Sequence, residues 1–171
     1  CLTYGRVGGS FLGAVDFELF GDDFDLVAQH GGDMVIEPSA GGGSFIPSIR
    51  KYWQSSESVF LDIEPEHPDV TRMDFLQYRG FHQNSIVIGN PPFGKNSSLA
   101  VKFFNHSASL NVDWICLILP KTFMKPRFWN RLSTEYTLIE QKILDKNSFT
   151  LDGIVWDVPC VAQIWTREPR E

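Results

Sequence analysis

Short apolar runs alternate along the chain with stretches whose apolar residues recur at helical spacing. Runs of about four to eight apolar residues between turn-forming residues are typical of buried strands, and apolar residues three or four positions apart are typical of helices that cover a sheet. The apolar runs predict seven strands, at residues 33–38, 58–65, 70–76, 84–92, 113–120, 138–145 and 158–168. The helical spacing predicts helices at residues 16–30, 46–54, 97–110 and 126–136.

The alternation of strands and helices predicts an α/β fold with a doubly wound, mostly parallel seven-stranded sheet and helices on both faces. The run at 113–120 is almost continuously apolar, as a central parallel strand should be. The run at 138–145 fits a strand or a helix by its pattern, and its place in the alternation favours a strand. We expect an N-terminal helical segment at 1–32 and one main domain at 33–171.

Composition narrows the class of protein. The 171 residues are 43% hydrophobic and 21% charged, as in an ordinary globular domain. No apolar run is long enough for a transmembrane helix, no signal-peptide pattern opens the chain, and a first residue other than Met leaves open that the chain is a fragment. Three scattered cysteines predict no disulfide framework, which favours an intracellular setting: cytoplasm, nucleus, or a virus replicating in a cell. Isolated histidines and the absence of Cys-x-x-Cys predict no metal site.

The net charge of −6 disfavours tight, unaided binding of nucleic acid, because phosphate contacts need a basic surface. Lys121, Lys125, Arg127 and Arg131 are an exception, since they lie within eleven positions of each other after the strand expected at 113–120. They fit either a solvated helix face or a surface that meets phosphates. Both readings stay open at this point.

Ligands of doubly wound sheets bind at the carboxyl ends of the strands, so the residues that follow each strand are candidates for a site. The first strand ends at Glu37 and is followed by three glycines at 41–43, which let a backbone approach a ligand closely. This loop is neither Gly-x-Gly-x-x-Gly nor a phosphate-binding P-loop. The second strand ends near Asp62 and Glu64, which share one face and suit the hydroxyls of a ribose.

The next two strand ends carry similar groups. Asp74 and Phe75 follow the third strand, and Asn90-Pro91-Pro92-Phe93 follows the fourth. Two prolines cannot donate ladder hydrogen bonds, so the strand must stop there and leave one amide and one ring on a rigid turn. Each signal alone has an ordinary structural explanation, but four successive strand ends with suitable groups predict one shared site.

These motifs, in this order, resemble a known family. The segments "EPSAGGGSF", "LDIEP", "MDFL" and "NPPFG" are similar to the motifs of class I S-adenosylmethionine-dependent amino-methyltransferases, whose hallmark is Asn/Asp-Pro-Pro-Tyr/Phe/Trp. The resemblance covers roughly residues 35–165. It implies a Rossmann-like methyltransferase fold with S-adenosyl-L-methionine as the cofactor, and the "NPPFG" form looks most like the adenine-N6 enzymes.

The resemblance also implies roles for residues. The cofactor would be bound by Glu37, Ser39, Gly41, Gly43, Phe45, Asp62, Ile63, Asp74, Phe75 and Asn90. Within this set, Asp62 would hold the ribose and Asp74 the adenine amine. The catalytic motif would be Asn90, Pro91, Pro92 and Phe93: the Asn90 side chain and the Pro91 carbonyl would accept hydrogen bonds from the target amine, and Phe93 would stack on the target base. Phe149 and Lys121 are further candidates for substrate contacts.

The N-terminal segment 1–32 would contribute to the cofactor pocket, although "TYGRVGGSF" lacks the threonine-proline pattern often seen in that family. We expect the target to be the N6 amine of adenine in nucleic acid, with DNA slightly favoured over RNA. Guanine N2 in RNA, glutamine N5 in a protein, and a catalytically silent scaffold are the alternatives. The acidic charge and the lack of a large insertion predict that target recognition needs a missing domain or a partner subunit, or that the target is a small structured RNA.

Overall fold

The computed structural model describes residues 10–11, 17–29, 32–144, 149–151, 154–156 and 159–167. Seven of its strands form one sheet in the order β4-β3-β2-β5-β6-β10-β7. Their bounds are β2 (Met34–Glu37), β3 (Glu57–Asp62), β4 (Thr71–Arg72), β5 (Ser85–Gly89), β6 (Trp114–Pro120), β7 (Tyr136–Ile143) and β10 (Cys160–Arg167). All seven strands expected from the sequence are therefore confirmed, and the run at 138–145 is a strand.

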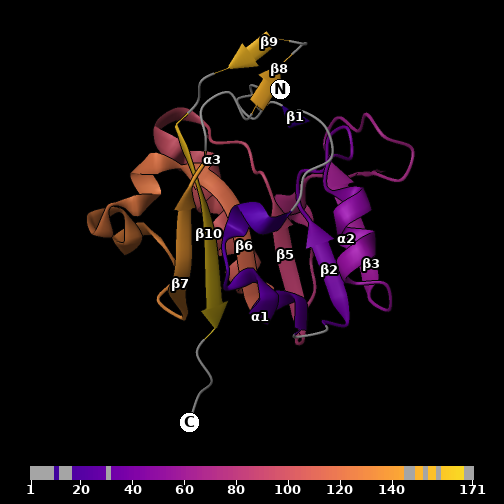
Figure 1. Ribbon diagram of the computed structural model, residues 1–171, viewed down its shortest axis with the longest axis horizontal. Helices are drawn as coiled ribbons and strands as arrows, with labels where there is room; N and C mark the ends of the chain where they lie inside the picture. The colour runs from indigo at the N-terminus through magenta and orange to yellow at the C-terminus, as the bar shows by residue number, and fades with distance from the viewer. Residues whose placement is uncertain are drawn as a thin grey trace.

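The first five strands in this order, β4, β3, β2, β5 and β6, run parallel, and β10 runs antiparallel to both of its neighbours. In Figure 1 β2 points to the top of the view and β10 to the bottom. The chain builds outward from β2 through β3 to β4, and then returns to lay β5 on the other side of β2. The mostly parallel, doubly wound sheet is confirmed. We call the side where the parallel strands end the carboxyl edge.

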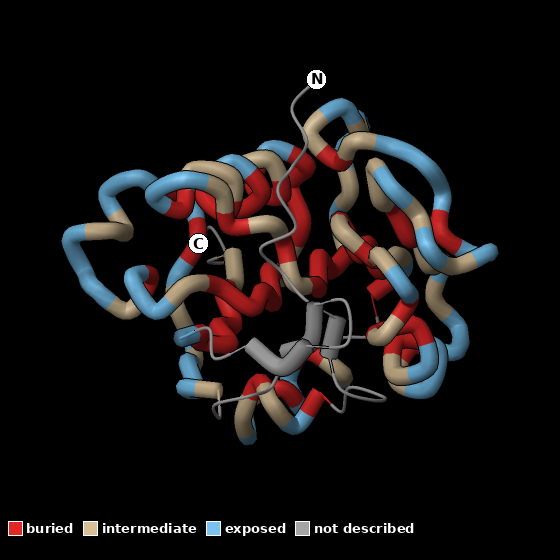
Figure 2. Tube along the Cα trace, turned by 90° about the horizontal axis from the view of Figure 1, so that it is seen from above, coloured by how far each residue is buried: buried red, intermediate tan, exposed pale blue. Residues whose placement is uncertain are grey.

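Helices cover both faces of this sheet. They are η1 (Phe17–Phe20), α1 (Phe24–Gln29), α2 (Ile46–Tyr52), η2 (Phe75–Gln77), η3 (Lys95–Ser97), α3 (Ser98–Ser109), η4 (Lys121–Met124) and η5 (Pro126–Arg131), where η denotes a 3-10 helix. Viewed from above, α1 and α2 lie on one side of the sheet and α3 lies on the other (Figures 1 and 2). The central strands are consequently buried on both faces.

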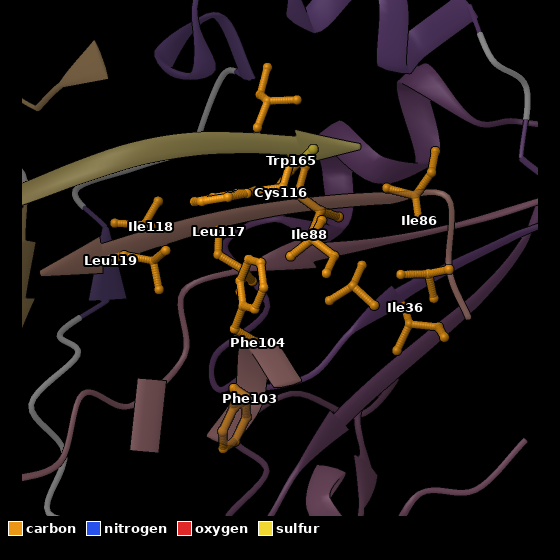
Figure 3. Close-up of a cluster of buried hydrophobic side chains, with 14 of the residues drawn as sticks. Ile36, Ile86, Ile88, Phe103, Phe104, Cys116, Leu117, Ile118, Leu119 and Trp165 are labelled. Carbon is orange, nitrogen blue, oxygen red and sulfur yellow. The ribbon is translucent and has the colours of Figure 1, made fainter. Parts of the chain in front are cut away.

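The core follows from this layering. Ile36 and Ile88, from the adjacent strands β2 and β5, lie in one buried cluster with Leu117 of β6 (Figure 3). On the α3 side, the Phe104 ring meets the Trp165 ring edge to face, with centroids 5.1 Å apart. Burial on both faces explains why these strands read as continuous apolar runs in the sequence.

The helix expected at 16–30 is wrong in one respect, because it is broken at Gly21. The backbone there has φ +96°, which an α-helix cannot contain and which glycine adopts at little cost. The turn brings the backbone amides of Asp22 and Asp23 to the Glu140 carboxylate of β7, at N···O distances of 3.1 and 2.7 Å. A carboxylate from a distant strand therefore caps α1, where the exposed amides and the helix dipole favour negative charge.

Two other elements are much shorter than expected. The third strand spans only Thr71–Arg72, because Asp74 accepts a 2.9 Å hydrogen bond from the Leu76 amide and starts η2. The helix expected at 126–136 is a 3-10 helix that ends at Arg131. Ser97 is the N-cap of α3, but its side chain makes no capping bond and its φ is +61°.

A second, small sheet was not expected. It has the order β1-β8-β9, with bounds β1 (Ser10–Phe11), β8 (Phe149–Leu151) and β9 (Ile154–Trp156). Figure 1 places the β8–β9 hairpin above the carboxyl edge of the main sheet. Pairing of β1 with β8 brings a piece of the N-terminal segment to the same region.

The Glu140 contact leads to a prediction about stability. In Glu140→Ala the amides of Asp22 and Asp23 lose their acceptor, so we expect the free energy of unfolding to fall by about 1–2 kcal/mol, the range for loss of a helix cap. Urea denaturation followed by circular dichroism measures the change. Glu57→Ala removes an exposed carboxylate from β3 and is the control. Equal stability of both variants would show that Glu140 does not hold the N-terminal segment.

Candidate functional site

The ends of β2 and β5 form the centre of the candidate site. The two strands pair in parallel, with Ile36 opposite Val87. Beyond the last paired residues, the Ser39 hydroxyl donates a 2.8 Å hydrogen bond to the backbone carbonyl of Asn90. This bond joins the glycine-rich loop to the Asn-Pro-Pro-Phe loop, so the two motifs are in direct contact.

The glycine-rich loop also closes over the end of β3. The amide of Ala40 donates to the Leu61 carbonyl, and the amide of Gly41 donates to the Asp62 carboxylate, both at 2.8 Å. Gly41 and Gly43 have positive φ values of +49° and +84°. Phe45, at the end of the loop, is buried, and its ring lies edge-on to Phe17 with centroids 5.4 Å apart. The N-terminal segment therefore packs directly behind this loop.

Asp62 is held in place from two sides. One carboxylate oxygen accepts the Gly41 amide, and the other accepts the Glu64 amide at 2.8 Å. The strand pattern alone left both Asp62 and Glu64 open, and the family resemblance favoured Asp62. The structure joins Asp62 to the glycine-rich loop, while the Glu64 side chain is exposed. Ile63 is half-buried, and its carbonyl accepts a 2.9 Å hydrogen bond from Arg72. Sequence reasoning missed Arg72, which is the last residue of β4 and lies beside Asp62 in the sheet.

Glu37 is the most unusual group at this edge. It is 3% exposed, and its Oε2 atom has no hydrogen-bond partner among the described residues. Burial, and secondarily the nearby Asp62 carboxylate, raise the pKa of Glu37 to about 8. The side chain is therefore largely a neutral acid at neutral pH, and an incoming cation would draw it into its charged form.

Asp74 and Phe75 lie beside the end of β3, since the Met73 amide donates to the Asp62 carbonyl at 2.9 Å. Phe75 is 1% exposed and packs against other rings, with centroids 5.3 Å from Phe103 and 4.9 Å from His106. The ring supports the floor of the site in this structure. Its packing on a cofactor ring stays a prediction.

The Asn-Pro-Pro-Phe loop supplies a second orphaned acceptor. The Oδ1 atom of Asn90 is buried and has no hydrogen-bond partner among the described residues. Pro91 is buried and Pro92 half-buried. The carbonyl of Phe93 accepts the amides of Leu99 and Ala100 at 3.0 and 3.2 Å, which ties the loop to the first turn of α3. The Phe93 ring is 7% exposed, so stacking on a base would require the loop to open.

The remaining two substrate candidates lie apart from these contacts. Lys121 is exposed at the start of η4, and its backbone amide donates to the Pro159 carbonyl at 3.1 Å. Phe149 belongs to β8, and its side chain lies outside the described part of the structure. The structure thus brings Glu37, Ser39, Asp62 and Asn90 together, and leaves the roles of Lys121 and Phe149 as predictions.

The fold is similar to those of known methyltransferase structures. The structure superposes on a putative RNA methyltransferase from Pyrococcus horikoshii with a TM-score of 0.62 at 14% identity, covering 88% of this chain and 81% of that one. Magnesium protoporphyrin IX methyltransferase from Synechocystis PCC 6803, solved with bound SAM, gives 0.54 at 14% identity, over 92% and 86% of the two chains. The chain has the Rossmann-like methyltransferase fold.

Two further matches belong to proteins that are longer than this chain. A modification subunit of a putative type I restriction enzyme from Vibrio vulnificus YJ016 has the same methyltransferase fold, with a TM-score of 0.59 at 14% identity, over 93% of this chain and 45% of that one. In sequence, the Type II methyltransferase M.CvrRI of Paramecium bursaria Chlorella virus XZ-6E is 28% identical over 82 residues, which cover 40% of this chain and 22% of the viral protein. No protein-family model matches the chain.

Two further features are absent from the described residues. No group of three or more His, Cys, Asp or Glu side chains there is arranged to hold a metal ion. None of the helices in the described part is both long and apolar enough to cross a membrane.

The buried Glu37 predicts how the stability of this methyltransferase fold depends on pH. Below its ordinary pKa of 4.5 the carboxyl is protonated in both folded and unfolded chains; between 4.5 and about 8 only the unfolded chain releases the proton. The wild type should therefore lose stability relative to Glu37→Gln, by roughly 1 kcal/mol per pH unit across that window. Urea denaturation from pH 4 to pH 9 measures this difference, with the exposed Glu57→Gln as control. A difference that does not change with pH would contradict the raised pKa.

Proposed function

We propose that this chain is an S-adenosylmethionine-dependent methyltransferase that methylates the exocyclic N6 amine of adenine in nucleic acid, with DNA favoured over RNA. The observation that carries the proposal is a pair of buried acceptors without partners, Glu37 Oε2 and Asn90 Oδ1, at the ends of two neighbouring parallel strands. An unsatisfied buried polar group costs about 1–3 kcal/mol. Two such groups at neighbouring strand ends are expected where bound ligands supply the missing hydrogen-bond donors.

The groups around the glycine-rich loop fit the cofactor. S-adenosylmethionine supplies a methyl group on a sulfonium, and it also carries an ammonium group, ribose hydroxyls and an adenine amine. Glu37 suits the ammonium group, because a cation would offset the cost of ionising a buried carboxyl. Asp62 suits the ribose hydroxyls and Asp74 the adenine amine. Bound SAM in one of the matched methyltransferase structures supports the same choice of cofactor.

Asn90 suits the target amine. The lone pair of an exocyclic amine is delocalised into its ring, which makes the nitrogen a poor nucleophile. Acceptors at Asn90 Oδ1 and the Pro91 carbonyl would bind both N–H groups and favour a more tetrahedral nitrogen. The amine then forms the N–C bond as the S–C bond breaks, and its extra proton leaves to water. An amide is sufficient for this role because no strong base is needed, and alignment supplies much of the acceleration.

The substrate class has support from the matched proteins. The matched proteins include a type II methyltransferase, a modification subunit of a putative type I restriction enzyme and a putative RNA methyltransferase. A target base must leave a duplex before its amine can reach Asn90, and stacking on Phe93 would contribute about 1–3 kcal/mol. Because the sequence match spans 22% of the viral protein, we assign recognition of the target sequence to a further domain or a partner subunit. The segment 1–32 is proposed to complete the cofactor side, consistent with the packing of Phe17 on Phe45.

Transfer of methyl groups should depend on Asn90. We expect Asn90→Ala to lose transfer by at least about 100-fold, since it removes an acceptor that acts on the reacting nitrogen, while cofactor affinity changes little. The assay uses isotopically labelled S-adenosylmethionine with mixed DNA and RNA, followed by nucleoside mass spectrometry. Labelled N6-methyladenine in one polymer identifies the substrate.

Asn130→Ala, at an exposed asparagine of η5, is the matched control and should transfer normally. Normal transfer by Asn90→Ala would contradict the mechanism. Label in guanine or in protein glutamine would move the proposal to those amines, and cofactor binding without any transfer would favour the silent scaffold.

Cofactor affinity should depend on Asp62. In Asp62→Asn the side-chain oxygen can still accept the Gly41 amide, but the charge that strengthens hydrogen bonds to ribose hydroxyls is gone. We expect Kd for S-adenosylmethionine to rise about 10–100-fold, as for loss of hydrogen bonds to a charged group. Isothermal titration calorimetry measures the change, and Asp33→Asn, at the opposite end of β2, is the control. An unchanged Kd would exclude Asp62 from the cofactor site.

A further inference from the structure

Charge is distributed very unevenly along this acidic chain. Between Asn90 and Ser133 there are six lysines and arginines and a single carboxylate, Asp113, although the whole chain has a net charge of −6. Asp113 lies directly before β6, at the end opposite the carboxyl edge. The loops that follow β5 and β6 are therefore strongly basic, and they begin at the two strand ends next to each other in the sheet.

Four of these cations form what we call the basic surface: Lys95, Lys121, Lys125 and Arg127. All four are exposed, and no carboxylate of the described residues forms an ion pair with any of them. Like charges repel each other, so an unpaired group of cations in an acidic protein is the electrostatic footprint of a polyanion. The cations are not simply the solvated face of a helix, because they come from two separate loops.

The two loops are fixed to each other. The Arg131 guanidinium donates to the Asn96 carbonyl at 3.2 Å, and the Asn105 amide donates to the Arg131 carbonyl at 2.9 Å. The hydroxyls of Ser97 and Thr122 lie 3.4 Å apart. These contacts hold η4 and η5, the orange segment at the left of Figure 1, against the loop that begins with Asn90.

Hydrogen bonds also fix η4 and η5 to strand β10 of the sheet. The carbonyl of Phe123, a fully buried residue of η4, accepts hydrogen bonds from Trp129 Nε1 at 2.6 Å and from Gln163 Nε2 at 3.1 Å. Gln163 lies on β10 and is itself buried. The backbone that carries Lys121, Lys125 and Arg127 is thus preorganised, which lowers the entropic cost of holding an anion there.

The opposite half of the carboxyl edge has the opposite charge. The loop after β3, beside Asp62, carries the exposed carboxylates of Glu64 and Glu66. A chain of phosphates would be attracted to the loops after β5 and β6 and repelled from the loop after β3. The carboxyl edge is therefore acidic on the side of β3 and basic on the side of β6. The groups that we assign to the cofactor lie on the acidic half, and Asn90 lies at the boundary.

We propose that the basic surface binds the phosphate backbone of the nucleic acid and positions it so that the target amine reaches Asn90. The inference rests on the proposed function, because it takes nucleic acid as the substrate. It assigns non-specific affinity to this chain and leaves sequence recognition to another domain or subunit. The acidic net charge is then compatible with nucleic-acid binding, because the stretch that carries the basic surface has a single carboxylate, Asp113, at the opposite end of β6.

The test measures binding and transfer separately. Fluorescence anisotropy of labelled duplex DNA, single-stranded DNA and RNA gives Kd as a function of salt, for the wild type and for Lys125→Gln/Arg127→Gln. Each lost phosphate contact lowers the slope of log K against log salt by about 0.9 for a duplex and about 0.7 for a single strand. We expect the double variant to lose about two contacts, to weaken binding equally for all sequences, and to keep the cofactor affinity of the wild type.

The matched control is Lys51→Gln/Arg79→Gln, which removes the same charge from exposed positions that precede β3 and β5. It should bind nucleic acid like the wild type. Absence of binding by the wild type at low salt, an unchanged slope in Lys125→Gln/Arg127→Gln, or equally tight binding of polyglutamate would each overturn the inference.

The inference and the proposed function fail in different ways. If the wild type binds nucleic acid through the basic surface but transfers no methyl group to any nucleoside, the surface stands and the proposed function falls. If methyl transfer occurs and its KM for nucleic acid is the same in Lys125→Gln/Arg127→Gln, the function stands and the surface falls.

Discussion

The reversal of strand order between β2 and β5 is the constraint on which the rest of this structure depends. The chain leaves β2 in one direction, toward β3 and β4, and leaves β5 in the other, toward β6. The loops after two adjacent strands therefore diverge, and they expose the strand ends between them. Glu37 and Asn90 stand at those two ends. Their proximity is a consequence of topology rather than of any direct bond between their side chains.

One hydrogen bond links the loops that follow these two strands. Because the Ser39 hydroxyl holds the Asn90 backbone, the loop that we assign to the cofactor cannot shift without moving the loop that we assign to the target. The side chains of Glu37 and Asn90 remain orphaned beside this bond. The site thus combines a fixed backbone with unsatisfied side-chain acceptors. A ligand that donates hydrogen bonds to these acceptors would remove the free-energy cost of burying them without partners.

The features that sequence analysis predicted are those encoded locally. The apolar run of β6 and the two prolines after Asn90 determine their local structure within a few residues. The strand pattern alone did not separate Asp62 from Glu64, although the family resemblance favoured Asp62, because the fold of the glycine-rich loop is what distinguishes their contacts. The glycine at position 21 was visible in the sequence, but the acceptor for the amides that follow it was not, since Glu140 lies more than one hundred residues away. The same holds for Phe75, whose burial depends on Phe103 and His106 of α3.

The position of β10 has a consequence for how the chain folds as it is synthesised. The last strand of the sheet to be made lies between β6 and β7, and β7 pairs with no strand of the main sheet except β10. β7 therefore has no pairing partner in the main sheet until residues 160–167 have been synthesised. Glu140 belongs to β7, so the start of α1 is capped only after β7, which is made much later than α1, has joined the sheet. Such long-range closure slows folding and leaves apolar edges open in the meantime. Until β10 is in place, β6 has no neighbour on that side, and the parallel part of the sheet ends there in an open edge.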